Sequence, residues 1–328
     1  MMVDRLLVET ATVFAIDMPL RFRSIRQRQG MVWKGSAGWA EWSPFLDYPP
    51  AEAANWLRAA LEMAESGFPD PVRRSIPVNV TVPATDPITA YRLVKQSGCG
   101  TAKVKVAQAG QSLADDLERV EAVRAALGPS GRLRVDANGA WSLDQALTAI
   151  RKLSRFDLEY VEQPTAVVAD LAKLRRNLRL DSIRIAADES IRRVSDPMAV
   201  KRLEAADVIV LKVQPLGGVR ACLRLAEELD LPVVVSSAIE TSIGLRAGIA
   251  LAAALPTLPF ACGLNTASLL SADLVTPSLQ ASGGQITVRD ITPNADLLTA
   301  ARANSAVSAS WASRLADCWK ELDRVDAK

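Results

Sequence analysis

The sequence predicts an α/β protein whose main part is a closed (β/α) barrel of the TIM type, accompanied by a second, smaller domain. Three observations predict this fold class. From residue 78 onward, short runs rich in Val, Ile and Leu alternate with amphipathic stretches of about a dozen residues. Eight such runs follow one another along the chain. Charged or polar residues stand at the end of most of these runs, where barrel enzymes carry their active sites.

The chain before and after this region is less regular. The first 76 residues contain strand-like runs, an arginine-rich stretch at 21–28 and a segment that predicts a helix at 50–66. The alternating pattern stops near residue 277, and the tail mixes strand and helix signals. We therefore expect a barrel domain at 78–276, with residues 1–77 and 277–328 together forming the smaller domain.

The barrel strands are predicted directly from the apolar runs. They are VNVTV (78–82), AKVKV (102–106), RLRVD (132–136), LEYVEQ (158–163), RIAAD (184–188), VIVLKV (208–213), PVVVSS (232–237) and PFACGL (259–264). Amphipathic segments such as 113–127 and 143–153 predict the helices between them. Strands that alternate with helices pair in parallel through right-handed crossovers. An open doubly wound sheet is the alternative, but no GxGxxG motif follows any of these strands.

Composition excludes several classes of function. The 328 residues include no histidine, which rules out Ser-His-Asp triads and histidine-ligated zinc. The net charge of +2 gives no sign of a nucleic-acid or membrane partner. The four cysteines lie far apart and form no CxxC pair, so we expect reduced thiols in a cytoplasmic protein.

One segment needs care in a search for membrane spans. Residues 247–272 carry no charge, but Pro256, Pro259, Gly263 and Asn265 interrupt the segment. A buried helix followed by a buried strand explains it better. The first nine residues contain Asp4, Arg5 and Glu9 and do not resemble a signal peptide. We expect a soluble monomer or small homo-oligomer.

Polar residues at the strand ends form the candidate active site. One residue from each successive strand end is separated from the next by about 24 to 31 residues, close to one βα unit, in the series Lys105, Asp136, Glu162, Asp188, Lys212 and Ser236. The side chains at these strand ends should therefore converge on the barrel axis. They are Lys103, Lys105, Asp136, Asn138, Glu162, Asp188, Glu189, Lys212, Ser236 and Ser237.

Three carboxylates on adjacent strands suit a hard cation. Asp136, Glu162 and Asp188 would offer Mg²⁺ an oxygen cage, and Mn²⁺ fits the same donors. Without a cation, three close carboxylates would repel one another and raise their own pKa values. The alternative is that each residue separately caps the helix that follows it.

Lysines flank these carboxylates in the sequence. Lys105 and Lys212 should face each other across the barrel, and Lys103 points the same way as Lys105. A lysine becomes a base near neutral pH when burial or nearby positive charge lowers its pKa. The set therefore predicts proton abstraction next to a carboxylate, with cations that stabilise the enediolate.

The motifs around these residues resemble the enolase superfamily, in its muconate-lactonizing-enzyme-like branch. They are the Lys-x-Lys at 103–105, the Asp-Ala-Asn at 136–138, Val-Glu-Gln-Pro at 161–164, Ala-Asp-Glu-Ser at 187–190 and Lys212. RFRSIRQRQG, GSAGWAEWSPF, VLKVQPLGGV and SSAIETSIGL are similar to segments of the o-succinylbenzoate synthase family of actinobacteria. The resemblance implies a modified (β/α)7β barrel and an α+β capping domain made from both ends of the chain.

The resemblance also implies an activity. It is the dehydration of 2-succinyl-6-hydroxy-2,4-cyclohexadiene-1-carboxylate, a small dicarboxylate, to o-succinylbenzoate on the menaquinone pathway. In this chain the family's pattern implies that Asp136, Glu162 and Asp188 bind Mg²⁺, while Lys105 moves the proton and Lys212 stabilises the enediolate. The residues implied to orient these groups or to meet the substrate are Lys103, Asn138, Gln163, Glu189, Ser236, Ser237, Gly263, Leu264 and, on the arginine-rich loop, Arg21.

Other functions stay open at this point. An N-acylamino acid racemase of the same branch would use the same two lysines, and a dipeptide epimerase would need an acidic residue that is missing between Arg246 and Asp273. More distant alternatives are a Schiff-base aldolase built on Lys212 and a non-catalytic relative that only binds a ligand. Asn265 stands where the family usually carries glycine, and asparagine tolerates a left-handed backbone.

Overall fold

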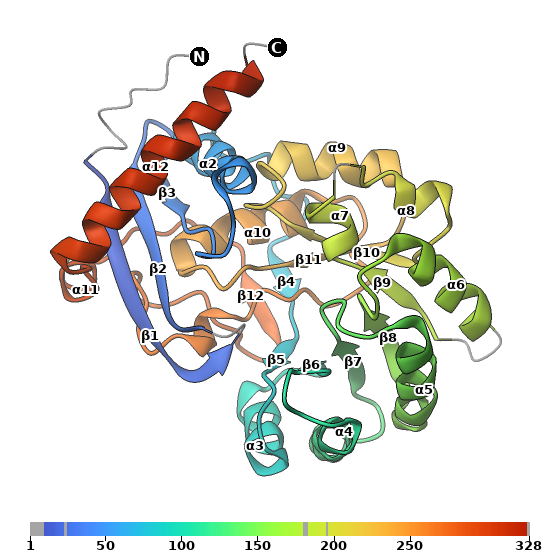
Figure 1. The fold of residues 1–328 in the computed structure, drawn as a ribbon. Coiled ribbons are helices and arrows are strands. Elements are labelled where there is room, and N and C mark those ends of the chain that lie inside the picture. The colour runs from blue at the N-terminus through green and yellow to red at the C-terminus, as the bar shows by residue number, and fades with distance from the viewer. Residues whose placement is uncertain (1–9, 23–24, 180–182, 195, 327–328) are drawn as a thin grey trace.

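The computed structural model describes residues 10–22, 25–179, 183–194 and 196–326. Its centre is a parallel sheet of seven strands in the order β11-β10-β9-β8-β7-β6-β5, with helices outside it (Figure 1). The strands are β5 (Val80–Val82), β6 (Thr101–Lys105), β7 (Arg132–Asp136), β8 (Leu158–Glu162), β9 (Ile185–Ala187), β10 (Val208–Lys212) and β11 (Val233–Ser236).

The predicted eighth strand closes this sheet into a barrel, although it is not a continuous strand. Cys262 bridges to Val78 and Gly263 bridges to Ser236, both in parallel. The Cys262 amide donates to the Pro77 carbonyl at 2.7 Å, and the Gly263 amide donates to the Val235 carbonyl at 2.8 Å. The segment thus bonds to both edges of the sheet over two residues only. The modified (β/α)7β barrel is confirmed.

Helices follow the strands as the amphipathic segments predict. The longer ones are α3 (Pro87–Ser97), α4 (Leu113–Leu127), α5 (Leu143–Leu153), α6 (Val168–Leu178), α9 (Val219–Leu229) and α10 (Ser242–Ala254). The predicted helices at 113–127 and 143–153 are α4 and α5. Each begins with a capping box, on Ser112 and Ser142, which satisfies two of the backbone amides at the helix start.

The βα unit after β9 departs from this regularity. It contains two one-turn helices, α7 (Glu189–Arg192) and α8 (Ala199–Arg202), instead of one long helix. Because α7 begins directly after β9, its side chains stay close to the strand end. This placement matters for the active site.

A second layer covers the barrel. The antiparallel strands β1 (Thr12–Phe22), β2 (Ile25–Lys34) and β3 (Trp39–Trp42) form a sheet in that order, followed by α2 (Pro50–Glu65). The C-terminal helices α11 (Ala295–Ala300) and α12 (Ser305–Asp326) return to it, and α12 runs beside the sheet and α2 (Figure 1). The rings of Trp42 and Trp311 meet edge to face at 5.2 Å. Both ends of the chain therefore build one capping layer.

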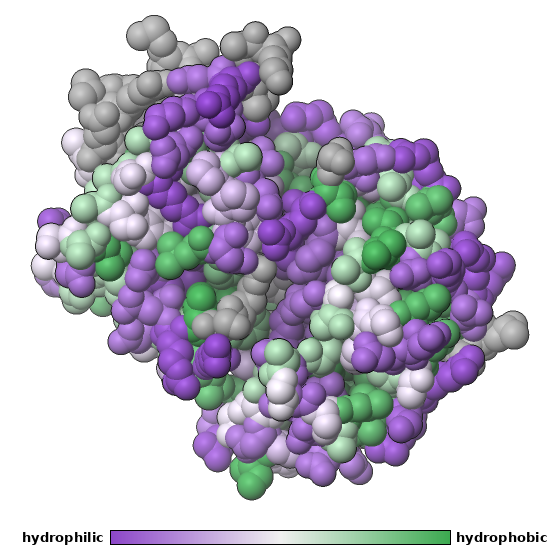
Figure 2. All heavy atoms as spheres, in the orientation of Figure 1, coloured by the Kyte–Doolittle hydropathy of each residue, from purple (hydrophilic) through white to green (hydrophobic). Residues whose placement is uncertain are grey.

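The tail also pairs with the segment that leads into the barrel. Strand β12 (Gln285–Thr287) is antiparallel to β4 (Ser75–Pro77), just before β5. Within the described part of the chain, no helix is long and apolar enough to cross a membrane. The uncharged segment at 247–272 divides into the end of α10, a loop and the closing segment. The cysteines are free, as predicted, and all four are buried. Figure 2 shows apolar residues scattered in small groups among hydrophilic ones on the face drawn.

Candidate active site

The strand register brings the predicted site residues to one level. Lys105 lies opposite Asp136, and Asp136 lies opposite Glu162, in consecutive parallel pairs. On the other side of the barrel, Lys212 lies opposite Ser236. The carboxylates are fully buried. Residues about one βα unit apart in the sequence are therefore neighbours in space.

Lys103 connects two of these carboxylates. Its Nζ donates to Glu162 Oε1 and Oε2 at 2.8 and 3.0 Å, and it lies 3.2 Å from Asp136 Oδ2. Burial, together with the nearby charges of Asp136 and Asp188, raises the pKa of Glu162 to about 7. Burial also opposes ionisation of Asp136, but Lys105 and Lys103 outweigh it and lower the pKa of that carboxyl. The carboxylates and lysines of this cluster thus lie close enough to shift one another's pKa values.

Lys105 stands at the edge of the same cluster. Its Nζ is in contact with Asp136, donates to Asn138 Oδ1 at 2.8 Å and lies 5.5 Å from the centre of the Phe22 ring. Burial and the charges of other lysines lower the pKa of Lys105, although Asp136 opposes this. A lowered pKa is what a lysine needs to act as a base.

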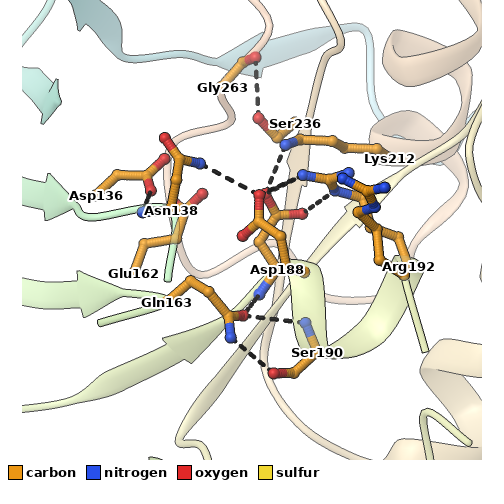
Figure 3. Close-up of polar contacts among 12 residues, drawn as sticks. Asp136, Asn138, Glu162, Gln163, Asp188, Ser190, Arg192, Lys212, Ser236 and Gly263 are labelled. Atoms are coloured by element: carbon orange, nitrogen blue, oxygen red, sulfur yellow. Dashed lines mark hydrogen bonds and ion pairs between the residues drawn. The ribbon is translucent and has the colours of Figure 1, made fainter. Parts of the chain in front are cut away.

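Asp188 is held by two cations on the far side of the cluster (Figure 3). Lys212 Nζ donates to Asp188 Oδ2 at 2.6 Å. Arg192 Nε donates to Oδ1 at 2.7 Å, and its Nη2 lies 3.3 Å from Oδ2. Arg192 also contacts Glu189 and the Tyr48 hydroxyl. Sequence reasoning missed Arg192; its position four residues after Asp188, on a helix that starts at the strand end, was the available signal.

Two amide side chains orient the carboxylate region. Gln163 Oε1 accepts from the backbone amides of Asp188 and Ser190 at 2.9 and 3.1 Å, and its Nε2 donates to Ser190 Oγ at 2.7 Å. The backbone N–H of Asn138 donates to Asp136 Oδ1 at 3.0 Å, and the side-chain Nδ2 of Asn138 donates to Glu189 Oε1 at 3.2 Å (Figure 3). Both residues fix the backbone and the neighbouring side chains around the cluster.

A narrow pocket opens above these groups. The lysines at 103, 105 and 212 line it, together with Arg192, and aromatic side chains of the capping layer complete it. The residues that sequence reasoning did not include are Phe22, Phe45, Tyr48, Trp56, Thr81, Pro215, Ala238, Ile239 and Thr266. Most of the aromatic ones belong to segments far from the barrel in sequence, so no local pattern pointed to them.

Three of the four barrel residues predicted to face the substrate line the pocket, and one does not. Ser236, Ser237 and Gly263 line the pocket, whereas Leu264 is buried and lies instead against Gly248 of α10. Ser236 Oγ lies 3.5 Å from the Gly263 carbonyl oxygen (Figure 3). The Ser237 and Thr266 hydroxyls are 2.6 Å apart.

The arginine-rich stretch divides into residues with different surroundings. Arg21 is exposed and lines a neighbouring polar cavity with Lys105, Asn138 and Arg193 rather than the pocket itself. Arg28 is buried at the interface between the capping layer and the barrel. Arg23 lies outside the described residues.

Asn265 does not need the conformational tolerance that we expected of it. It is not among the described residues with positive φ. Its side-chain oxygen instead accepts from the Ala281 amide at 2.9 Å, which ties the closing segment of the barrel to the tail.

The three buried carboxylates are the donors that could hold a divalent cation. Among the described residues, no three acidic or thiol side chains are arranged as a metal cluster, and the carboxylates are instead paired with lysines and Arg192. The chemistry of the donors nevertheless fits Mg²⁺. Asp136, Glu162 and Asp188 are fully buried oxygen donors, and burial together with the charges of Asp136 and Asp188 raises the pKa of Glu162.

Solved structures of other proteins share this architecture. The chain is similar to muconate lactonizing enzyme from Pseudomonas fluorescens complexed with muconolactone (TM-score 0.76, 21% identity, 89% of this chain and 98% of the other). It is also similar to the L-Ala-D/L-Glu epimerase from Bacillus subtilis (TM-score 0.72, 23% identity, 87% and 96%). At these identities the likeness concerns the fold, which is that of enolase-like capped barrels.

Sequence comparison narrows the class. Residues 88–293 match the family model of enolase C-terminal domain-like proteins, and residues 13–64 match that of enolase N-terminal domain-like proteins. The chain is 56% identical to the o-succinylbenzoate synthase of Thermobifida fusca over 318 residues, 96% of this chain and 98% of that protein. It is 46% identical to the one of Mycobacterium tuberculosis over 319 residues, 96% and 95% of the two chains. The chain belongs to the o-succinylbenzoate synthase family of the enolase superfamily.

Proposed function

We propose that this protein dehydrates 2-succinyl-6-hydroxy-2,4-cyclohexadiene-1-carboxylate to o-succinylbenzoate, as a carbon–oxygen lyase of menaquinone biosynthesis. The observation that carries the proposal is the pair of lysines, Lys105 and Lys212, on opposite sides of a buried carboxylate cluster. They stand on β6 and β10, four strands apart in a barrel of seven strands and a closing segment. The 56% identity to a protein named o-succinylbenzoate synthase supports the choice of reaction.

The two lysines would take different roles. Lys105, as the neutral amine, would remove the proton from the carbon next to the ring carboxylate, and the electron pair would move into an enediolate. The resulting Lys105 ammonium would return that proton to the departing hydroxyl on the same face, so that water leaves and the ring becomes aromatic. Lys212, as a cation on the opposite side, would stabilise the enediolate.

The surrounding residues would prepare the site for this charge. Asp136, Glu162 and Asp188 would hold Mg²⁺, with Mn²⁺ as a substitute, and the ion would supply Lewis-acid stabilisation of the negative charge when bound. Asn138, Gln163 and Glu189 would orient the carboxylates, and Lys103 would balance their charge. Arg192 and the lysines give the pocket the positive charge that suits a dicarboxylate.

The aromatic wall suits a six-membered ring. Phe22, Phe45, Tyr48 and Trp56 line the same pocket as the lysines. The described lining residues contain no carboxylate, which disfavours a substrate with a free ammonium group and therefore a dipeptide epimerase.

A spectrophotometric assay tests the proposal. Purified protein with Mg²⁺ is mixed with the cyclohexadiene substrate, and the loss of diene absorbance is followed. We expect rapid loss that disappears in Lys105→Ala and after EDTA treatment, while Lys173→Ala, at an exposed ion pair with Asp170, behaves as the unmodified protein. No loss with a folded, metal-loaded protein would refute the assignment.

N-Acylamino acid racemisation is the second candidate, because both lysines line the pocket from opposite sides. Such a racemase needs each lysine to exchange a proton with the α-carbon. Incubation of N-succinyl amino acids in D₂O distinguishes the two reactions, since racemisation introduces deuterium at the α-carbon of both enantiomers. Absence of deuterium together with active dehydration would leave the dehydratase alone.

A further inference from the structure

The loop after β11 forms one wall of the pocket and contains an unusual backbone conformation. Ser236, Ser237, Ala238 and Ile239 all line the pocket. Ile239 has a φ of +61°, in the left-handed region that β-branched residues rarely adopt. Such a conformation persists only where surrounding contacts impose it. The contacts that hold Ile239 therefore determine the shape of this wall.

The main contact comes from the capping layer. Arg28 of β2 is only 2% exposed, and its Nε donates to the Ile239 carbonyl oxygen at 2.9 Å. Its Nη2 lies 3.3 Å from the Ala238 carbonyl oxygen and donates to Ser43 Oγ at 2.9 Å. The guanidinium also lies 4.6 Å from the centre of the Phe45 ring. Arg28 thus bonds to the backbone of two wall residues without lining the pocket.

A carboxylate from the same sheet holds the other end of the loop. Glu41 of β3 accepts from the backbone amides of Thr241 and Gly244 at 3.1 and 3.0 Å, at the start of α10. Ser43 Oγ donates to Glu41 Oε1 at 2.6 Å and so connects this carboxylate to Arg28. We name Arg28, Glu41 and Ser43 the cap clamp. It offers a cation to the loop carbonyls and carboxyl oxygens to the loop amides, and hydrogen bonds donated by a charged guanidinium are stronger than those between neutral groups.

We infer that Arg28 is a positioning residue, which holds Ile239 in its left-handed conformation and so shapes one wall of the pocket. For the identity of the substrate that meets this wall, the inference rests on the proposed function. Arg28 acts through the backbone at Ala238 and Ile239. Its loss should therefore change substrate binding much more than the chemical step.

Two measurements on Arg28→Met test this role. The first is hydrogen exchange, by mass spectrometry, of the peptide that covers 233–241, because the Ser237 amide donates to the Gly263 carbonyl oxygen and the Ala238 amide donates to the Glu240 carboxyl group. We expect exchange to accelerate by about tenfold or more. The second is steady-state kinetics with the cyclohexadiene substrate, where we expect KM to rise by about tenfold with kcat within about threefold. Arg124→Met is the matched control, since Arg124 also bonds to several backbone carbonyls but lies away from the pocket.

A second substitution tests the strain itself. Glycine adopts positive φ without a steric penalty, so Ile239→Gly should keep the loop in place without Arg28. In the Ile239→Gly background, Arg28→Met should change loop exchange by less than about threefold. An equal effect in both backgrounds, or an Arg28→Met protein that matches Arg124→Met in exchange and KM, would overturn the inference. Should Arg28→Met fail to fold, Arg28→Lys decides by the same measurements, since it keeps the charge but loses the planar fork.

The exchange measurement separates this inference from the proposed function because it needs no substrate. Faster loop exchange in Arg28→Met, cancelled by Ile239→Gly, supports the positioning role even where the unmodified protein fails to convert the cyclohexadiene. Conversion by the unmodified protein with no effect of Arg28→Met on exchange or KM would reject the positioning role and leave the dehydratase standing.

Discussion

Removal of the Lys103 ammonium should reveal how strongly the buried carboxylates depend on a cation. Lys103 is only 5% exposed, and its Nζ lies 2.8 and 3.0 Å from the two oxygens of Glu162 and 3.2 Å from Asp136. Both carboxylates are fully buried. Lys103→Met preserves most of the side-chain volume and removes only the charge. The substitution therefore isolates the electrostatic contribution.

The expected loss of stability follows from this geometry. Breaking a buried ion pair by removing one partner destabilises a protein by about 3–5 kcal/mol, because the remaining charge is left buried and unpaired. For a protein of this size we expect the melting temperature to fall by roughly 5–10 °C. Lys173→Met removes an ion pair with Asp170 whose lysine side chain is 52% exposed, and it should cost less than about 1 kcal/mol.

Magnesium should partly replace the lost ammonium. Thermal and urea unfolding of both variants is measured in EDTA and then at saturating Mg²⁺, where a ligand at 100 times its Kd stabilises the native state by about 2.7 kcal/mol. We expect Lys103→Met to gain more from Mg²⁺ than the unmodified protein does. If Lys103→Met lies within about 1 kcal/mol of the unmodified protein in EDTA, the argument that the cluster needs this cation is wrong.

Three further predictions concern other parts of the molecule. Burial raises the pKa of Glu41 to about 7, above its unfolded value of 4.5. The contribution of this carboxyl to the free energy of unfolding is therefore complete below about pH 4.5 and is lost as the pH rises through about 7. Urea unfolding across pH 5–8 should show this component, up to about 3 kcal/mol, and Glu41→Gln should lack it; an unchanged pH profile would contradict the assignment. In Gly263→Ala the new Cβ would lie 2.6 Å from Ser236 Oγ, so we expect a loss of about 1–3 kcal/mol in urea unfolding, mostly recovered by adding Ser236→Ala, and a lack of recovery would rule out this clash. Trp311→Ala should cost about 3–5 kcal/mol in thermal unfolding, because Trp311 is 2% exposed and packs against Trp42, and a loss under 1 kcal/mol would show that α12 is not held there.

The barrel side of the site could be predicted because parallel strands impose a simple rule. Each βα unit has a similar length, and neighbouring strands pair in phase. Sequence spacing alone therefore predicts that Lys105, Asp136 and Glu162 lie next to one another. The same rule predicts that Lys212 and Ser236 lie together. It fails after Asp188, where the unit contains one-turn helices and brings Arg192 back to the strand end.

The capping side obeys no such rule. Arg21 and Arg28 stand in the same arginine-rich stretch, yet Arg21 is exposed and Arg28 is buried against a loop 211 residues away. The alternation of side chains along β2 does not predict which arginine is buried, because Arg26 and Arg28 lie on the same face of the strand. Arg26 is nevertheless exposed and Arg28 is buried. What distinguishes them is where the sheet crosses the barrel, which is a tertiary property.

The barrel and the capping layer have different parts in the proposed reaction. The groups proposed to move the proton and to bear the charge, Lys105 and Lys212, belong to barrel strands whose geometry is set by local pairing. The wall at Ile239 keeps its conformation through Arg28, a contact between layers. A change in the capping sheet can therefore alter the pocket wall without moving either lysine. We accordingly expect substitutions in the cap clamp to raise KM for the cyclohexadiene substrate in steady-state kinetics, while kcat changes little.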